Sequence, residues 1–288
     1  MSLGSRIVGV VLLAWATCCD PLHAGPISPG SGHQPADVNG TTLDVYTYRP
    51  QCPNPTILLV IHGLNRNADS YRTYARSIGD RLCMLVIAPK FDRERFPGWR
   101  FQRGGIVNNR GVVQPPSQWT GNLAIGVVDW VRQQEVRPLI AYSMIGHSAG
   151  AQFLSRIAAF NPNDAGRMVV TNPSTYVFPT LKTNAPYGMG GVYSGGEAEA
   201  ALRRYLAAPV TIFLGQEDLG DENRNDGPEA VAQGKTRYER GLNVYAAAKA
   251  EAQARAWQLN WGLVELPGVG HNAAKMFSSR QALDALAP

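Results

Sequence analysis

The sequence predicts an α/β fold in which helices cover both faces of a mostly parallel central sheet. Short, continuous apolar runs such as residues 57–61 and 84–88 recur along the chain, as expected for strands that are buried on both faces. Segments with helical character separate many of these runs, and this alternation is typical of a parallel sheet. The chain has 288 residues and no internal repeat, which indicates one large domain.

The expected elements follow one another along most of the chain. Strands are expected at residues 43–48, 57–61, 84–88, 141–145, 168–171, 210–214 and 263–266. Helices are expected at residues 68–81, 119–131, 149–160, 236–257 and 274–286. Residues 90–116 form a connection rich in Gly, Arg and aromatic residues, and a loop of that length is uncommon unless it has a function. Ligands bind at the carboxyl ends of strands in such sheets, so catalytic residues are expected just after strands.

The amino-terminal segment has the pattern of a secretory signal peptide. Arg6 precedes an apolar run over residues 7–15, and Ala24 is a small residue at a plausible cleavage point. The Gly-, Pro- and Ser-rich stretch that follows is typical of a flexible segment. The expected division of the chain is a signal peptide at 1–24, a flexible tail at 25–40 and one α/β domain at 41–288.

Cysteine usage agrees with export to a secreted or periplasmic location. Cys18 and Cys19 lie in the leader, where the residues before them are poor matches to a lipidation site, so no lipid anchor is expected. Cys52 and Cys83 each precede an expected strand, and parallel strands would bring both to the same edge of the sheet. We therefore predict a Cys52–Cys83 disulfide, which an exported compartment permits. No internal apolar run is long enough to span a membrane.

A serine occupies the turn between one expected strand and the next helix. Residues 146–150 read Gly-His-Ser-Ala-Gly, a G-x-S-x-G pattern with an apolar strand before it and a helix after it. Small residues at Gly146 and Gly150 let neighbouring elements approach the turn. The turn would expose the Ser148 hydroxyl beside a helix amino terminus, whose dipole favours developing negative charge. This context favours a nucleophile over a simple packing turn.

From residue 43 to residue 286 the chain resembles the α/β-hydrolase family. The resemblance rests on the Ser148 motif and on His62-Gly63-Leu64-Asn65, which ends the expected strand at 57–61. It implies an oxyanion hole formed by the backbone N–H groups of Leu64 and Ala149. Leu64 and Asn65 replace glycines of the H-G-G-G form of this loop. We expect the His62 side chain to be structural.

The same resemblance places the acid and the base after the last two expected strands. Asp218 follows Gly215 in a G-x-x-D pattern and is the best match for the acid; its neighbours Glu217 and Asp221 are the alternatives. His271 lies in a Gly-rich loop after the last strand and is the expected general base. Elimination supports it, because His147 is adjacent to Ser148 and cannot readily fold back onto the hydroxyl. The order Ser148, Asp218, His271 is the order of the family.

No metal ion or organic cofactor is implied by the sequence. Asp221, Asn223 and Asn225 are spaced like the start of a calcium loop, but Asp226 occupies the position that requires glycine, and Ala232 the position that requires glutamate. A polar surface loop is the better interpretation.

Aromatic and basic residues give the only hints about the substrate. Trp99, Phe101 and Tyr176 are predicted to line a substrate groove. The formal net charge is +5, and Arg residues gather between 90 and 110, which favours an anionic substrate if this segment borders the site. Nucleic acid is not an expected partner, because the basic residues form no long run and no binding motif is present.

Three functions follow from these patterns. The first is a secreted serine hydrolase that cleaves carboxylic esters through an acyl-enzyme on Ser148. The second is an amide hydrolase or polyester depolymerase that acts on an anionic polymer such as poly(aspartic acid). The third is a non-catalytic binding protein on a hydrolase scaffold, which the presence of nucleophile, acid, base and oxyanion loop disfavours.

Overall fold

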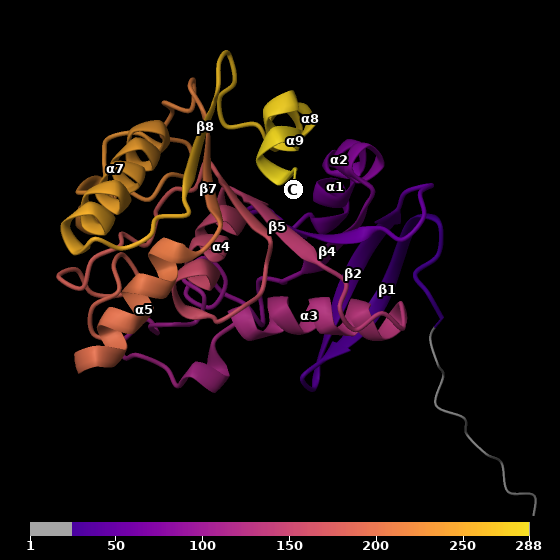
Figure 1. The fold of residues 1–288 in the computed structure, drawn as a ribbon, viewed down its shortest axis with the longest axis horizontal. Helices are drawn as coiled ribbons and strands as arrows, with labels where there is room; N and C mark the ends of the chain where they lie inside the picture. The colour runs from indigo at the N-terminus through magenta and orange to yellow at the C-terminus, as the bar shows by residue number, and fades with distance from the viewer. Residues whose placement is uncertain (1–24, 288) are drawn as a thin grey trace, which may run out of the picture.

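The computed structural model describes residues 25–287 and confirms an α/β architecture around one sheet (Figure 1). The sheet has eight strands in the order β1-β2-β4-β3-β5-β6-β7-β8. The strands are β1 (Gly30–Val38), β2 (Thr41–Arg49), β3 (Thr56–Ile61), β4 (Met84–Lys90), β5 (Tyr142–His147), β6 (Arg167–Thr171), β7 (Val210–Gly215) and β8 (Gly262–Leu266). Only β2 pairs antiparallel with its neighbours β1 and β4; the other pairs are parallel. The predicted signal peptide lies outside the described residues.

Helices cover both faces of the sheet. One face carries α1 (Ala68–Tyr74), α2 (Arg76–Leu82), α8 (Ala273–Ser278) and α9 (Arg280–Leu286); the other carries α3 (Gly121–Gln134), α4 (Ala149–Phe160), α5 (Gly195–Ala207) and α7 (Arg237–Arg255), as Figure 1 shows. A 3-10 turn at Pro116–Gln118 and the short α6 (Pro228–Val231) lie in connections. Strand β3 shows why both layers form: Leu59 packs into the core of one face and Leu58 into the core of the other.

The prediction of a flexible tail over residues 25–40 is wrong for residues 30–38, which form strand β1. Ala36 and Val38 are buried and Asp37 between them is exposed, so this end of the strand has one core face. The Asn39-Gly40 turn joins β1 to β2, and both turn residues have positive φ (52° and 74°), as a tight hairpin turn requires. This turn was a hairpin signal that the Gly- and Pro-rich composition obscured.

Several helices also differ from the sequence prediction. The helix expected at 68–81 is divided at Ala75 into α1 and α2, and the helix expected at 274–286 is divided at Ser279 into α8 and α9. Helix α5 was not predicted. Its buried residues nevertheless follow helical spacing on one face: Ala198, Ala201, Leu202, Tyr205 and Leu206.

The structure joins Cys52 and Cys83 in the predicted disulfide, with their Cα atoms 5.9 Å apart. The bond lies where the sheet argument placed it, because Thr56, four residues after Cys52, pairs in β3 with Met84 of β4, which directly follows Cys83. Within residues 25–287, no helix is both long enough and apolar enough to cross a bilayer.

Candidate active site

The carboxyl ends of the central strands meet at one pocket of about 550 Å³. Strand β5 ends at His147 and presents Ser148, while the loops after β7 and β8 bring in Asp218 and His271. The loop after β3 adds Leu64 to the same lining. Residues far apart in the sequence are therefore gathered where a parallel sheet is expected to bind its ligand.

Ser148 lies at a strained turn between β5 and α4. Its φ of 58° and ψ of −120° are unusual for a residue with a side chain. The turn is possible because its flanks are glycines: a Cβ on Gly146 would lie 2.7 Å from the Gly150 backbone, and one on Gly150 would lie 2.3 Å from the Ile61 carbonyl. The Ser148 N–H donates to the Thr171 carbonyl at 3.0 Å, which fixes the turn to β6. The two glycines thus serve the close approach that the sequence pattern predicted.

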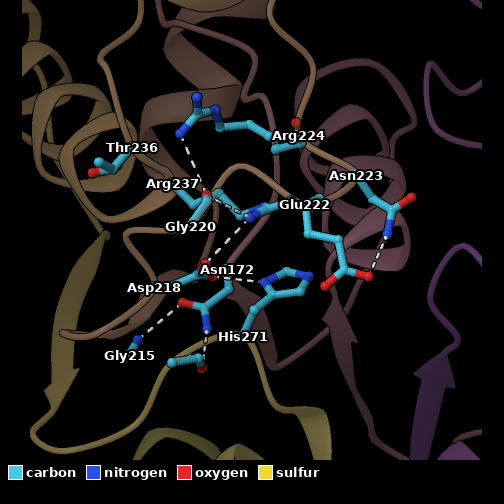
Figure 2. A network of polar contacts seen from close by, with 12 residues as sticks. Asn172, Gly215, Asp218, Gly220, Glu222, Asn223, Arg224, Thr236, Arg237 and His271 are labelled. Atoms are coloured by element: carbon cyan, nitrogen blue, oxygen red, sulfur yellow. Dashed lines mark hydrogen bonds and ion pairs between the residues drawn. The ribbon is translucent and has the colours of Figure 1, made fainter.

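Asp218 contacts His271 directly (Figure 2). Its Oδ2 atom lies 2.7 Å from Nδ1 of His271, and the carboxylate is 1% exposed. Because an ionised carboxylate only accepts hydrogen bonds, this contact places the imidazole proton on Nδ1 and leaves Nε2 as the basic nitrogen. His271 is 29% exposed and lines the pocket that contains Ser148.

A buried arginine holds the other oxygen of Asp218. Arg237, at the start of α7, places Nη1 3.3 Å from Oδ1 of Asp218, and both side chains are 1% exposed. The same guanidinium also donates to the carbonyls of Gly220 and Glu222 (Figure 2). Asp218 is therefore fixed between one basic partner and the imidazole, and the loop after β7 is fastened to α7.

Asn172 connects the loops that carry the acid and the base. It follows β6, is fully buried and has a φ of 49°. Its Oδ1 accepts from the Gly215 N–H at 2.9 Å, and its Nδ2 donates to the Gly270 carbonyl at 3.5 Å (Figure 2). One side chain thus holds the residue at the end of β7 and the residue just before His271.

The neighbouring carboxylates are not placed like Asp218. Glu217 and Asp221 are both exposed, and neither forms an ion pair with His271 among the described residues. The alternative assignments of the acid are therefore disfavoured by position.

The two backbone N–H groups expected to form an oxyanion hole are both available. Neither Leu64 N–H nor Ala149 N–H donates to an acceptor within residues 25–287. Leu64 lines the pocket, and Ala149 begins helix α4 directly after Ser148. The Ser148 hydroxyl likewise makes no hydrogen bond within these residues; such contacts are often long without substrate and shorten in the complex.

His62 orients the loop that carries the Leu64 amide. Its Nδ1 lies 2.9 Å from the Gly63 carbonyl, and its Nε2 accepts from the Phe91 N–H at 3.0 Å. These contacts fix one neutral tautomer and hold the peptide group that ends in the Leu64 N–H. Burial lowers the pKa of His62 to about 3. The side chain has the structural position that was expected of it.

His147 is buried beside the predicted base. Its ring centroid lies 4.5 Å from that of His271, and its Nδ1 lies 3.3 Å from the Tyr71 hydroxyl. Burial, and then the nearby basic groups of His271 and Arg237, lower the pKa of His147 well below the ordinary value. A neutral His147 therefore packs against the His271 ring without placing a second positive charge beside it.

Two of the three predicted substrate contacts are wrong. Phe101 is fully buried and packs on Phe91 and Phe153, while Tyr176 is 1% exposed beneath α7. Aromatic side chains in irregular segments give no sequence periodicity from which their direction can be predicted. Trp99 is half-buried and lines a second pocket beyond Leu64.

Sequence reasoning missed Arg237 and Asn172. Arg237 has a basic side chain at the start of a long helix, and nothing local distinguishes it from a solvated arginine. Asn172 carried a weak signal, because polar residues just after a parallel strand are candidates for a site.

Comparison with known proteins places the chain in a family. The family is shown by solved structures, since no family model and no curated protein matches the chain. A poly(3-hydroxybutyrate) depolymerase, LpqC, from Bordetella parapertussis is 30% identical with a TM-score of 0.84, and the match covers 93% of this chain and 97% of that one. The poly(aspartic acid) hydrolase-1 of Sphingomonas sp. KT-1 is 30% identical with a TM-score of 0.82, covering 90% of this chain and 99% of that one.

A more distant structure supports the fold alone. The S-formylglutathione hydrolase FrmB of Staphylococcus aureus is 13% identical with a TM-score of 0.56, and the match covers 88% of this chain and 97% of that one. Together with the eight-stranded sheet and the strand-to-helix serine, the two closer matches show that the chain belongs to the α/β-hydrolase family of serine hydrolases.

Replacing Arg237 tests its effect on Asp218. We expect Arg237→Met to lower kcat on the order of 10²-fold with little change in KM, because the arginine positions the acid rather than the substrate. The matched control is Arg255→Met, on the same helix and away from the pocket. Steady-state hydrolysis by the folded variants measures both constants. A wild-type kcat in Arg237→Met would contradict the assignment.

The pH dependence of stability tests the neutral state of His62. Its folded-state pKa of about 3 is below the ordinary 6.5, so between these values the unfolded chain binds a proton that the folded chain does not. This stability is present above about pH 6.5 and is lost as the pH falls toward 3, by about 1.4 kcal/mol per pH unit. Urea unfolding should show a correspondingly smaller pH slope in His62→Asn. Equal slopes in the two proteins would contradict a neutral buried His62.

Proposed function

We propose that the protein is a secreted serine hydrolase that cleaves carboxylic esters through an acyl-enzyme on Ser148. The observation that carries this proposal is the 2.7 Å contact between Asp218 and His271 in the pocket that Ser148 also lines. A carboxylate, an imidazole and a strained serine in one pocket are the parts that nucleophilic acyl transfer needs.

Each group has a defined role in the proposed reaction. Nε2 of His271 accepts the proton of Ser148 as the serine oxygen attacks the substrate carbonyl. Asp218 accepts the Nδ1–H hydrogen bond, which holds the ring and stabilises the imidazolium that forms. His271 then gives the proton to the departing alcohol. Water, deprotonated by the same nitrogen, releases the acid from Ser148 and restores the free enzyme.

The negative charge that develops on the carbonyl oxygen is assigned to two backbone donors. The N–H groups of Leu64 and Ala149 would both donate to this oxygen, and each such donor is worth roughly 3–4 kcal/mol in the transition state. Two features support the assignment: neither N–H has another acceptor within the described residues, and His62 fixes the Leu64 peptide.

We further propose that the protein acts outside the cytoplasm. The Cys52–Cys83 disulfide supports this location, because such bonds persist in oxidising compartments. The pattern of the first 24 residues agrees with it.

A second candidate is hydrolysis of an ester or amide bond in a polymer. Two relatives that are 30% identical over nearly the whole chain are named as a poly(3-hydroxybutyrate) depolymerase and a poly(aspartic acid) hydrolase. The open pocket over Ser148, about 550 Å³ in volume, has room for more than a small acyl group.

A substrate panel on the purified mature protein tests the proposal. Short-chain 4-nitrophenyl esters should be hydrolysed, and Ser148→Ala should lower kcat on the order of 10⁴–10⁶-fold while the fold is retained. The control Ser278→Ala, at an exposed serine on α8, should behave as wild type. Full activity in Ser148→Ala would contradict the proposal.

The same panel separates the two candidates. Poly(3-hydroxybutyrate) film and polyaspartate are added, each at low and high salt. Cleavage of polyaspartate that salt inhibits strongly, while hydrolysis of the neutral ester is insensitive to salt, supports the polyanion candidate.

A further inference from the structure

A second pocket, of about 480 Å³, adjoins the pocket of Ser148. Leu64 and Asn223 line both, so the second pocket begins beside the residue assigned to the oxyanion hole. Its remaining lining comes from the 97–109 segment, from α4 and from the loops after β6 and β7. A group attached to a substrate carbonyl at Ser148 can therefore extend into it.

The lining of this second pocket is cationic. It contains Arg103, Arg156 and Arg224, and no aspartate or glutamate. Arg93, which donates to the Leu64 carbonyl at 3.2 Å, adds a positive charge at the boundary between the two pockets. The first pocket differs, since exposed Glu217 and Glu222 are part of its lining. The exposed carboxylates thus lie in the first pocket, whereas the lining of the second pocket has arginines and no carboxylate.

Arg156 is a buried charge without an acidic partner. It is 1% exposed, and its two terminal nitrogens donate to the carbonyls of Gln152, Thr175 and Pro186 and to the Thr175 hydroxyl at 2.8–3.1 Å. Its Nε has no partner within residues 25–287, and no carboxylate there lies within ion-pair distance. Burial lowers its pKa to about 10, so it remains charged at neutral pH.

Arg103 is also uncompensated, and it is more accessible. Its side chain is half-buried and forms no hydrogen bond or ion pair within the described part of the chain. Arg224 differs, because Asp226 accepts from it at 2.7 Å. The pocket therefore holds two positive charges that nothing in residues 25–287 neutralises. Uncompensated charge at a buried position is costly, and an anion in the pocket would relieve that cost.

We propose that this pocket is a carboxylate-binding subsite, in which Arg103 holds a carboxylate of the substrate whose carbonyl is at Ser148 and the buried positive charge of Arg156 attracts that carboxylate. This inference rests on the proposed function, which it narrows to esters or amides that carry a second, ionised carboxyl group. Arginine is suited to the role because its guanidinium binds carboxylates through charge-assisted hydrogen bonds. The arrangement favours a substrate whose one carboxylate enters the second pocket over a substrate that also places negative charge in the first pocket.

The test compares two esters that differ only in the end of the acyl chain. 4-Nitrophenyl hydrogen adipate carries a carboxylate where 4-nitrophenyl hexanoate carries a methyl group; suberate and octanoate form a longer pair. The measured quantity is the ratio of kcat/KM for the anionic ester to that for the neutral one. We expect Arg103→Gln to lower this ratio about tenfold for at least one pair. The control Arg110→Gln, an exposed arginine of the same segment outside the pocket, should leave the ratio unchanged.

Arg103 is chosen because Arg156 also braces two loops and its replacement can unfold the protein. A ratio in Arg103→Gln equal to that of wild type for both pairs overturns the subsite, whatever the absolute rates. Ser148→Ala tests the proposed function separately, through loss of turnover of the neutral ester. If neither ester is hydrolysed, thermal stabilisation by adipate dianion decides: stabilisation of wild type that Arg103→Gln lacks supports the subsite, and no stabilisation of wild type overturns it.

Discussion

The arrangement of the site depends on the two contacts that the buried Asp218 carboxylate makes. One oxygen accepts from His271 and the other pairs with Arg237, so a single buried group joins the loops after β7 and β8 to the start of α7. Removing its charge would leave Arg237 buried without an acidic partner and His271 without the acceptor that sets its tautomer. Asn172 reinforces the same arrangement from the end of β6, because it binds Gly215 at the end of β7 and Gly270 within the loop after β8.

The other half of the site depends on backbone geometry. Ser148 has a positive φ in a turn whose close contacts only glycine at positions 146 and 150 permits, and this turn places Ser148 in the lining of the pocket. The Leu64 N–H is held indirectly, because the His62 ring contacts the Gly63 carbonyl and the Phe91 N–H. Burial keeps this ring neutral, so the same tautomer persists throughout the neutral pH range.

The features that were predictable from the sequence are those with a local signature. Continuous apolar runs predicted the parallel strands, and Ser148 and His271 became candidates through their neighbours and their positions after strands. Arg237 was not predicted, because its partner Asp218 lies 19 residues away and the contact depends on how α7 packs against the loop after β7. Asn172 was not predicted either, because its hydrogen-bond partners lie 43 and 98 residues further along the chain. The burial of Phe101 and Tyr176 was not predictable for the same reason. In segments without periodicity, only tertiary packing decides which side chains face inward.

Labelling of Ser148 by a fluorophosphonate probe tests the central claim most directly, because the reaction needs an activated serine but no particular substrate. Peptide mapping by mass spectrometry should find one label per chain, on the peptide that contains Ser148. The labelling rate should fall roughly 10³-fold or more in His271→Ala, which lacks the base. A label on another residue, or an equal rate in His271→Ala, would contradict the account.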